Sequence, residues 1–216
     1  MLVDNGRVSD ESGAETAAEP ETPAEPPAGD APAAVPTEEL PRKRGMLLLI
    51  LAPLIFAADL LTKVLALNAL DGEPPVRILG GAVYLQIVRN PGAAFGMATG
   101  MTWLLTIVAV GVVVAIIWLM PKLRSIGWAI GLALVLAGAL GNLADRFFRA
   151  PGPLRGHVID FVSLFAPNGD VWPVFNVADS SIVCGGALIV LMALLGRDYD
   201  GRRTNAKDKS SVEDTA

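Results

Sequence analysis

The sequence predicts an all-α membrane protein with four transmembrane helices and a small extracytoplasmic β-element that rests on the membrane surface. Two observations predict this fold class. Of the 216 residues, 52% are hydrophobic and only 18% are charged, and the mean hydropathy is +0.49, which is too apolar for a soluble domain of this size. The apolar residues are also gathered into four long stretches, and roughly 20 helical residues cross the ~30 Å hydrocarbon core of a bilayer.

The first part of the chain differs in composition from the rest. Residues 1–41 are rich in Ala, Pro, Glu and Thr, and the first 40 hold ten Asp or Glu residues against Arg7 alone. A segment with so few large apolar side chains cannot offset the entropy lost on ordering, so we predict a disordered acidic tail. The sequence pI of about 4.9 reflects this tail and indicates nothing about the partners of the membrane domain.

The four apolar stretches predict membrane-spanning helices at about 46–68, 101–120, 126–146 and 177–196. Asp59 and Lys63 are the only charged residues of the first stretch, and Asp179 is the only one between Val171 and Gly196. Because Asp179 precedes an uncharged run that is short for a span, we expect it at the outer membrane interface.

Lys and Arg residues indicate the orientation of the chain. They flank the first helix, join the second to the third, and follow the fourth: Arg42, Lys43, Arg44, Lys122, Arg124, Arg197, Arg202 and Arg203. A path of four helices brings these sites to one side, which the positive-inside rule makes cytoplasmic. Both termini are then cytoplasmic, with a membrane domain over 42–197 and a polar cytoplasmic tail over 198–216. The connections 71–100 and 145–178 are expected outside, although the arginines of the second one reduce the asymmetry.

The first outer connection contains a strand pattern. In VYLQI at 83–87, Val, Leu and Ile alternate with Tyr and Gln, which is the period of a half-buried strand. Gly80 and Gly81 precede it and would supply a turn or bulge. We therefore expect a small sheet here.

Two groups of charged or polar residues lie within or at the ends of predicted spans, where a charge costs at least ~2.5 kcal/mol on insertion scales. Asp59 and Lys63 lie four residues apart on one helix face; the favoured interpretation is an internal ion pair, and the alternative is a catalytic or substrate-contacting group. Asn142, Asp145 and Arg146 share a face of the third helix, where a polar clamp between helices is favoured over direct chemistry.

Asp160 and Asp179 are the candidate catalytic residues. Taken alone, Asp179 is interpreted equally well as a helix-initiating carboxylate, one turn after Asn176, and Asp160 as a strand-end residue. Both belong to one outer connection and have apolar neighbours, which favour an uncharged carboxyl group. Two such carboxyl groups brought together share a proton, so that one takes a proton from water while the other donates to a carbonyl oxygen. Sequence spacing does not show that the two meet.

Several function classes are disfavoured. The sequence has one cysteine, one histidine and no HExxH motif, so we expect no intrachain disulfide, no metal and no cofactor. The GxGD signature of other membrane aspartyl proteases is absent, as is a serine motif with a histidine partner.

Two alternatives to an enzyme are left open. In a small proton-coupled transporter or channel component, Asp59, Asp145 and Asp179 would form a relay through the bundle, together with an inverted repeat, although no repeat is visible. A scaffold that only binds partner helices would leave the aspartates unexplained.

Five blocks, in order, resemble the lipoprotein signal peptidase family, also called signal peptidase II. They are DLLTK at 59–63, NPGAAFG at 90–96, GNLADR at 141–146, HVIDF at 157–161 and FNVADS at 175–180. The resemblance covers about residues 45–196 and implies that Asp160 and Asp179 are catalytic. It also implies supporting roles for Asp59, Lys63, Asn90, Asn142, Arg146 and Asn176. Gly92, in a turn whose backbone can approach a ligand, and Asp145 complete the candidate set.

The resemblance further implies a substrate and a location. The expected substrates are prolipoproteins whose cysteine carries diacylglycerol, with cleavage just before that cysteine and with inhibition by globomycin-type peptides. The expected location is the bacterial cytoplasmic membrane, with membrane lipid around the protein and the active site near the extracytoplasmic face. No nucleic acid partner is expected.

Overall fold

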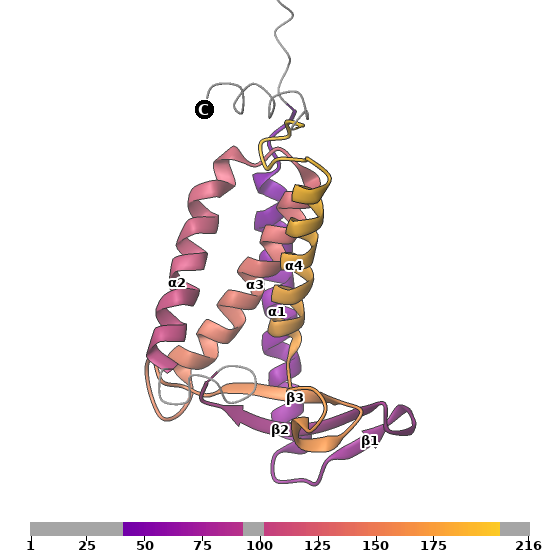
Figure 1. Cartoon of the computed structure of the whole chain (residues 1–216). Coiled ribbons are helices and arrows are strands. Elements are labelled where there is room, and N and C mark those ends of the chain that lie inside the picture. The colour runs from indigo at the N-terminus through magenta and orange to yellow at the C-terminus, as the bar shows by residue number, and fades with distance from the viewer. Residues whose placement is uncertain (1–40, 93–101, 204–216) are drawn as a thin grey trace, which may run out of the picture. The chain divides into compact units, whose positions relative to one another are not determined.

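The computed structural model describes residues 41–92 and 102–203, so the acidic tail, residues 93–96 of the NPGAAFG block and the end of the C-terminal tail lie outside the described chain. The described residues form four long helices and a three-stranded antiparallel sheet (Figure 1). The helices are α1 (Gly45–Leu70), α2 (Thr102–Leu119), α3 (Ile126–Phe148) and α4 (Val177–Leu194), and the strands are β1 (Val76–Ile78), β2 (Val83–Asn90) and β3 (Val158–Leu164). This arrangement confirms the predicted four long helices with a small β-element.

All four helices are long and apolar enough to cross a membrane. Large apolar side chains remain exposed along their outer surfaces, including Leu54 at 63%, Ile107 at 58% and Val190 at 57%. Such extended apolar exposure would be unfavourable in water and is expected in lipid. α4 ends two residues before the predicted boundary, because Gly196 adopts a φ of 63° and turns the chain out of the helix.

α3 is the central helix of the bundle. It packs against each of the other three helices, whereas α2 packs mainly on α3 (Figure 1). The backbones of α3 and α4 touch at Gly131 and Gly185, since a Cβ atom at Gly185 would lie 2.6 Å from the Gly131 carbonyl oxygen. Small residues therefore allow these two helices to approach closely, as is common in membranes.

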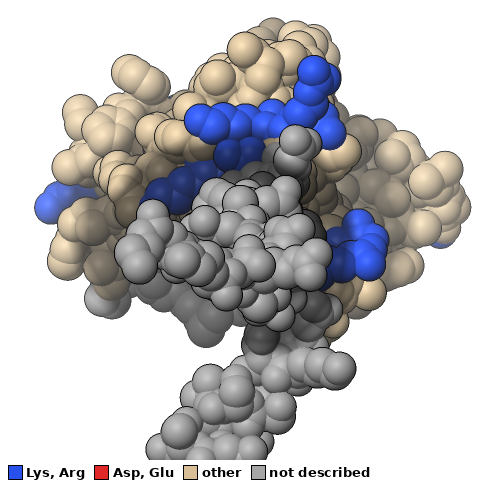
Figure 2. Space-filling model, turned by 90° about the horizontal axis from the view of Figure 1, so that it is seen from above, with Lys and Arg blue, Asp and Glu red and all other residues tan. Residues whose placement is uncertain are grey.

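Three basic segments meet at one end of the bundle. The Arg44 amide donates to the Leu123 carbonyl (2.7 Å), which joins the start of α1 to the turn between α2 and α3, and the Arg124 amide donates to the Tyr199 carbonyl (2.8 Å) in the segment after α4. The eight Lys and Arg residues predicted to be cytoplasmic belong to these three segments. Figure 2 shows Lys and Arg side chains gathered over this end.

The sheet lies at the opposite end of the helices (Figure 1). Its strand order is β1-β2-β3, and β2 pairs with β3 from Val83 opposite Leu164 to Asn90 opposite Val158. The predicted strand at 83–87 is present within β2 and extends to Asn90. No bounds were predicted for β3, because its VIDFVSL sequence lacks a strict apolar–polar alternation. Asp160, considered above as a strand-end residue, is instead the third of the seven residues of β3.

The burial of β2 differs from the predicted pattern. Gln86 is the buried residue of the strand, while its apolar neighbours Leu85 and Ile87 are only half-buried. The Gln86 Oε1 atom accepts a hydrogen bond from the Asn168 amide (3.1 Å), and a bulge lies between Leu85 and Val88. The hydrogen bond satisfies the oxygen of the buried amide side chain, whereas the Gln86 Nε2 atom has no hydrogen-bond partner among the described residues. The bulge shifts the alternation of the strand.

A short segment connects the sheet directly to α4. Phe175 exchanges two backbone hydrogen bonds of 2.9 Å with Val162 on β3. α4 begins two residues later, at Val177. The first turn of α4 is thereby held against β3, and this contact builds the candidate site.

Candidate active site

Asp160 is the third residue of β3, and its side chain is 2% exposed. Its two carboxyl oxygens accept hydrogen bonds from two asparagine side chains, Asn90 at 2.9 Å and Asn176 at 2.7 Å. The orientation of Asn90 is set by the Gly92 amide, which donates to Asn90 Oδ1 (2.9 Å) and leaves the Asn90 NH₂ group to face Asp160. Asp160 is thus held between the end of β2 and the start of α4.

Asp179 lies in the first turn of α4, where it forms a capping box with Asn176. The Asp179 amide donates to Asn176 Oδ1 (2.9 Å), and the Asn176 amide donates to Asp179 Oδ2 (3.2 Å). Asn142 on α3 donates to the other carboxylate oxygen (2.8 Å). These bonds satisfy orphan amides of the helix start and fix the Asp179 side chain.

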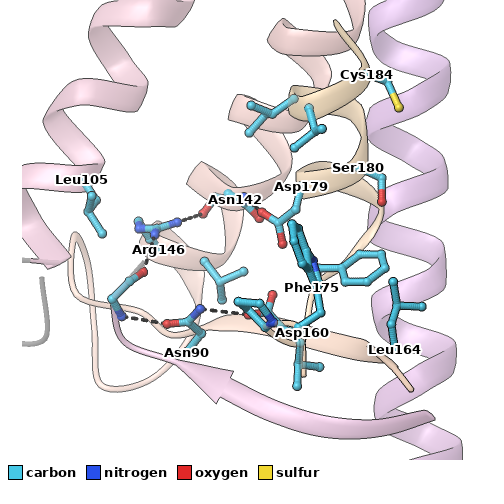
Figure 3. Close-up of a pocket in the computed structure, with 17 residues that line it drawn as sticks. Asn90, Leu105, Asn142, Arg146, Asp160, Leu164, Phe175, Asp179, Ser180 and Cys184 are labelled. Carbon is cyan, nitrogen blue, oxygen red and sulfur yellow. Dashed lines mark hydrogen bonds between the residues drawn. The ribbon is translucent and has the colours of Figure 1, made fainter. Parts of the chain in front are cut away.

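Asn176 therefore contacts both candidate catalytic residues. Its side-chain NH₂ group binds Asp160 and its backbone amide binds Asp179, so one residue holds the two carboxyl groups in the same neighbourhood. Figure 3 shows Asp160 and Asp179 facing one pocket, with Asn142 and Arg146 of α3 beside them. The structure brings together two residues whose proximity the sequence alone did not show.

The environment of Asp160 favours its protonated form. Burial, followed by the negative charge of Asp179, raises the pKa of Asp160 from its ordinary value to about 7, although hydrogen bonds from Asn90 and Asn176 and the charge of Lys63 oppose the shift. A carboxylic acid that is protonated near neutral pH, next to a second carboxyl group, is the arrangement required for paired acid and base catalysis.

The two aspartates line a cavity of about 570 Å³. It is bounded by α2, α3, α4, the end of β2, β3 and the segment that precedes α4, and most of its surface is apolar. The apolar lining consists of Leu105, Val158, Leu164, Trp172, Pro173, Val174, Phe175, Ile182 and Val183. Sequence reasoning did not identify these residues, because apolar side chains that line a cavity do not differ in sequence from those that face lipid.

Four of the predicted supporting residues, Asn90, Gly92, Asn142 and Arg146, also line this cavity. The Arg146 guanidinium, 8% exposed, donates to the carbonyl oxygens of Asn142 (3.3 Å) and Gly92 (3.2 Å). Within the described chain, Arg146 forms no ion pair with a carboxylate. It therefore presents a positive charge to the cavity that contains the two aspartates.

The other four predicted supporting residues do not line the cavity. Asn176 contacts both aspartates, as described above, and Asp59, Lys63 and Asp145 form a separate buried cluster. Lys63 has no exposed surface, and its Nζ atom lies 2.8 Å from Asp59 Oδ2 and 2.8 Å from Asp145 Oδ2. The predicted ion pair between Asp59 and Lys63 is confirmed. Asp145 also pairs with Arg149, a partner that the sequence analysis did not name although the two lie four residues apart.

The packing of Asp59 requires a glycine that sequence reasoning did not identify as a site residue. A Cβ atom at Gly141 would collide with the Asp59 carboxylate and would lie 3.1 Å from the Ala178 side chain. Gly141 lies in the quoted GNLADR block, but only the tertiary structure shows which side chain needs the space.

Comparisons with known proteins agree with this geometry. The family model described as signal peptidase (SPase) II matches residues 51–195. A protein of Rhodococcus jostii named lipoprotein signal peptidase is 52% identical over 202 residues, covering 93% of this chain and 98% of that protein. Relatives of the same name from Mycolicibacterium smegmatis and Mycobacterium tuberculosis are 52% and 51% identical and cover 84% and 78% of this chain, or 76% and 82% of their own lengths.

Two solved structures share the fold. They are described as bacterial membrane enzymes determined by the in meso method at 2.3 and 1.9 Å resolution. They align with TM-scores of 0.61 and 0.60 at 24% and 25% sequence identity, over 72% of this chain and 92% and 97% of theirs. The alternative of a proton-coupled transporter is not supported, and of Asp59, Asp145 and Asp179 only Asp179 lines the cavity.

Proposed function

We propose that this chain, which belongs to the signal peptidase II family, is an aspartic endopeptidase that cleaves diacylglyceryl-modified prolipoproteins just before the lipidated cysteine. The observation that carries the proposal is the pair of carboxyl groups, Asp160 and Asp179, that meets at Asn176 in an apolar cavity. The lipoprotein substrate comes from the names of the relatives.

The reaction follows from one shared proton. Asp160 carries the proton, since its pKa is raised to about 7, and Asp179 is the carboxylate, which the positive end of the α4 dipole stabilises. Asp179 takes a proton from water while the water oxygen attacks the scissile carbonyl carbon, and Asp160 donates its proton to the carbonyl oxygen. Asp179 then gives its proton to the amide nitrogen while Asp160 takes a proton from a hydroxyl group of the tetrahedral intermediate. The carbon–nitrogen bond breaks, the new carboxylic acid and amine leave, and the pair returns to its starting state.

The cavity suits a substrate that stays in the membrane. Its apolar lining comes partly from α2 and α4, and such a surface can accommodate acyl chains and the end of an apolar signal helix. We infer that the substrate reaches the cavity from the lipid rather than from water. Membrane lipid is then the medium in which substrate and enzyme meet.

The orientation of the chain is also a proposal. The basic segments lie at the end away from the sheet, and the positive-inside rule assigns such an end to the cytoplasm. We infer that both termini are cytoplasmic and that the aspartates lie near the extracytoplasmic face of a bacterial cytoplasmic membrane.

The test compares the wild type with Asp160→Asn and Asp179→Asn, each purified in detergent and given a lipid-modified prolipoprotein peptide. We expect either substitution to lower turnover about 100- to 10,000-fold, since each removes a general acid or base. Asp170→Asn is the matched control, because Asp170 is exposed in the same connection and does not line the cavity. Near-normal cleavage by a folded Asp160→Asn or Asp179→Asn variant would contradict the proposal. We also expect globomycin-type peptides to inhibit the wild type.

A further inference from the structure

Two buried carboxylates, Asp59 and Asp145, each accept a hydrogen bond from the backbone amide that precedes one of the candidate catalytic residues. Asp59 Oδ1 accepts a hydrogen bond from the amide of Ala178 (2.9 Å), the residue before Asp179. Asp145 Oδ2 accepts one from the amide of Ile159 (3.2 Å), the residue before Asp160. Asp59 on α1 therefore holds the backbone of α4 just before Asp179, and Asp145 on α3 holds the backbone of β3 just before Asp160.

Lys63 is the group that joins these two carboxylates. Its ammonium group lies 2.8 Å from an oxygen of each and also donates to Asn142 Oδ1 (3.4 Å). Each of its three N–H donors thus has an acceptor. The contact with Asn142 also matters for Asp179, because an Asn142 oxygen that faces Lys63 leaves the NH₂ group to face Asp179.

We propose that Lys63 is a positioning residue that sets the separation of Asp160 and Asp179 by linking the carboxylates that hold the preceding backbone amides. The proposal rests on the proposed function, since it takes these two aspartates as the catalytic pair. Lys63 lies outside the cavity lining and is not itself given a chemical step.

Charge balance alone does not account for this arrangement. Asp145 already has a cationic partner in Arg149, so balancing the charge of Asp59 would not require Lys63 to contact both carboxylates. A buried ion pair does not by itself stabilise the folded protein, because the cost of removing the two charges from water offsets their attraction. The cluster instead links one ammonium group to two carboxylates, and each carboxylate accepts a hydrogen bond from a backbone amide on a separate element. A shift of about 1 Å in a catalytic group can lower the rate about 100-fold.

The decisive variant combines Lys63→Met with Asp59→Asn. Lys63→Met alone would leave Asp59 as an unpaired buried charge and could prevent folding. In the double variant, the Asp59→Asn side chain keeps an oxygen for the Ala178 amide and Asp145 keeps Arg149, so no buried charge is unpaired. We expect a folded protein in which kcat falls about 100-fold, while KM for the lipopeptide stays near the wild-type value because the cavity lining is unchanged.

Two further proteins complete the experiment. Arg149→Gln is the control, because it removes the other partner of Asp145 but leaves the link through Lys63; its kcat and KM should stay near wild type. Wild-type kcat in the double variant, or a loss of activity that comes from KM alone, would show that Lys63 only balances charge. Asp160→Asn, measured in the same assay, separates the two proposals. If Asp160→Asn is active, the proposed function fails. If Asp160→Asn is inactive but the double variant has wild-type activity, the positioning role fails.

Discussion

At the scale of single residues, the most informative side chain is Asn176. It is the N-cap of α4, and its amide group also binds Asp160 on β3. A cap is usually a local device that satisfies amides within one helix. Here the same residue also connects the start of α4 to β3 through a hydrogen bond. The capping interaction and the geometry of the catalytic pair therefore depend on each other.

The raised pKa of Asp160 predicts how activity depends on pH. Burial and the charge of Asp179 raise this pKa to about 7, so the carboxyl group is protonated below that pH and ionised above it. Since the mechanism needs the proton of Asp160, we expect kcat/KM to fall as the pH rises through about 7. The measurement is the rate of lipopeptide cleavage by detergent-solubilised protein from pH 5 to 9. A rate that stays constant across pH 7 would contradict the assignment of the proton to Asp160.

The same shift affects stability, and its sign is opposite to that of an ordinary salt-bridged aspartate. The folded protein binds this proton more tightly than the unfolded chain, in which the pKa of the carboxyl group is near its ordinary value of 3.8. The contribution of Asp160 to stability is therefore full below about pH 4 and is lost as the pH rises to about 7. Asp160→Asn lacks this loss, so its melting temperature relative to wild type should rise between pH 5 and pH 8. Thermal unfolding in detergent at the two pH values is the measurement, and a constant difference between the two proteins would contradict the raised pKa.

At the scale of elements, the junction of α1, α3 and α4 decides whether Asp59 can reach the start of α4. Gly141 on α3 faces both the Asp59 carboxylate and Ala178 of α4. Any side chain at position 141 would therefore compete for the space through which Asp59 accepts its hydrogen bond from the Ala178 amide. Close approach of helices at small residues thus contributes to the geometry of the site as well as to packing.

We expect Gly141→Ala to impair both stability and turnover. The added methyl group overpacks the junction, which typically costs about 1–3 kcal/mol, and it displaces Asp59 from the Ala178 amide. Thermal unfolding in detergent and lipopeptide cleavage are the measurements. Gly111→Ala is the matched control, because a Cβ atom at Gly111 in α2 meets nothing within 4 Å; it should behave like wild type. Equal behaviour of the two variants would show that the junction tolerates a side chain.

At the scale of the whole molecule, the basic segments and the candidate catalytic residues lie at opposite ends of the helices. The basic segments meet at the end away from the sheet, and the two aspartates lie at the end near the sheet. In the proposed orientation, a substrate held in the bilayer would be cut near the extracytoplasmic surface, which is where the proposed function requires the lipidated cysteine to lie.

The proposed orientation can be tested by labelling intact cells with a membrane-impermeant thiol reagent. Leu79→Cys places a thiol in the exposed turn between β1 and β2, where Leu79 is 78% exposed, and Lys122→Cys places one in the exposed turn between α2 and α3. We expect the first to react in intact cells and the second to react only after permeabilisation. The wild type, whose Cys184 lies in α4, sets the background. The reverse pattern would invert the orientation.

The sequence by itself determined the features that depend on near neighbours in the chain. Long apolar stretches specify the four helices because each helix satisfies its own backbone within the bilayer. The spacing of Asp59 and Lys63 specifies their ion pair, and Asn176 before Asp179 specifies the start of α4. These inferences use contacts within one helical turn, and the structure contains all of them.

Only the tertiary structure decided which of these elements meet. The hydrogen bond between Asp59 and Ala178 joins residues 119 positions apart, and the contact of Lys63 with Asn142 spans 79 positions. The meeting of Asp160 with Asn176 likewise depends on the backbone pairing of Phe175 with β3. Periodicity and spacing carry no information about such pairs, because side-chain contacts between separate elements are set by how helices and strands pack against one another.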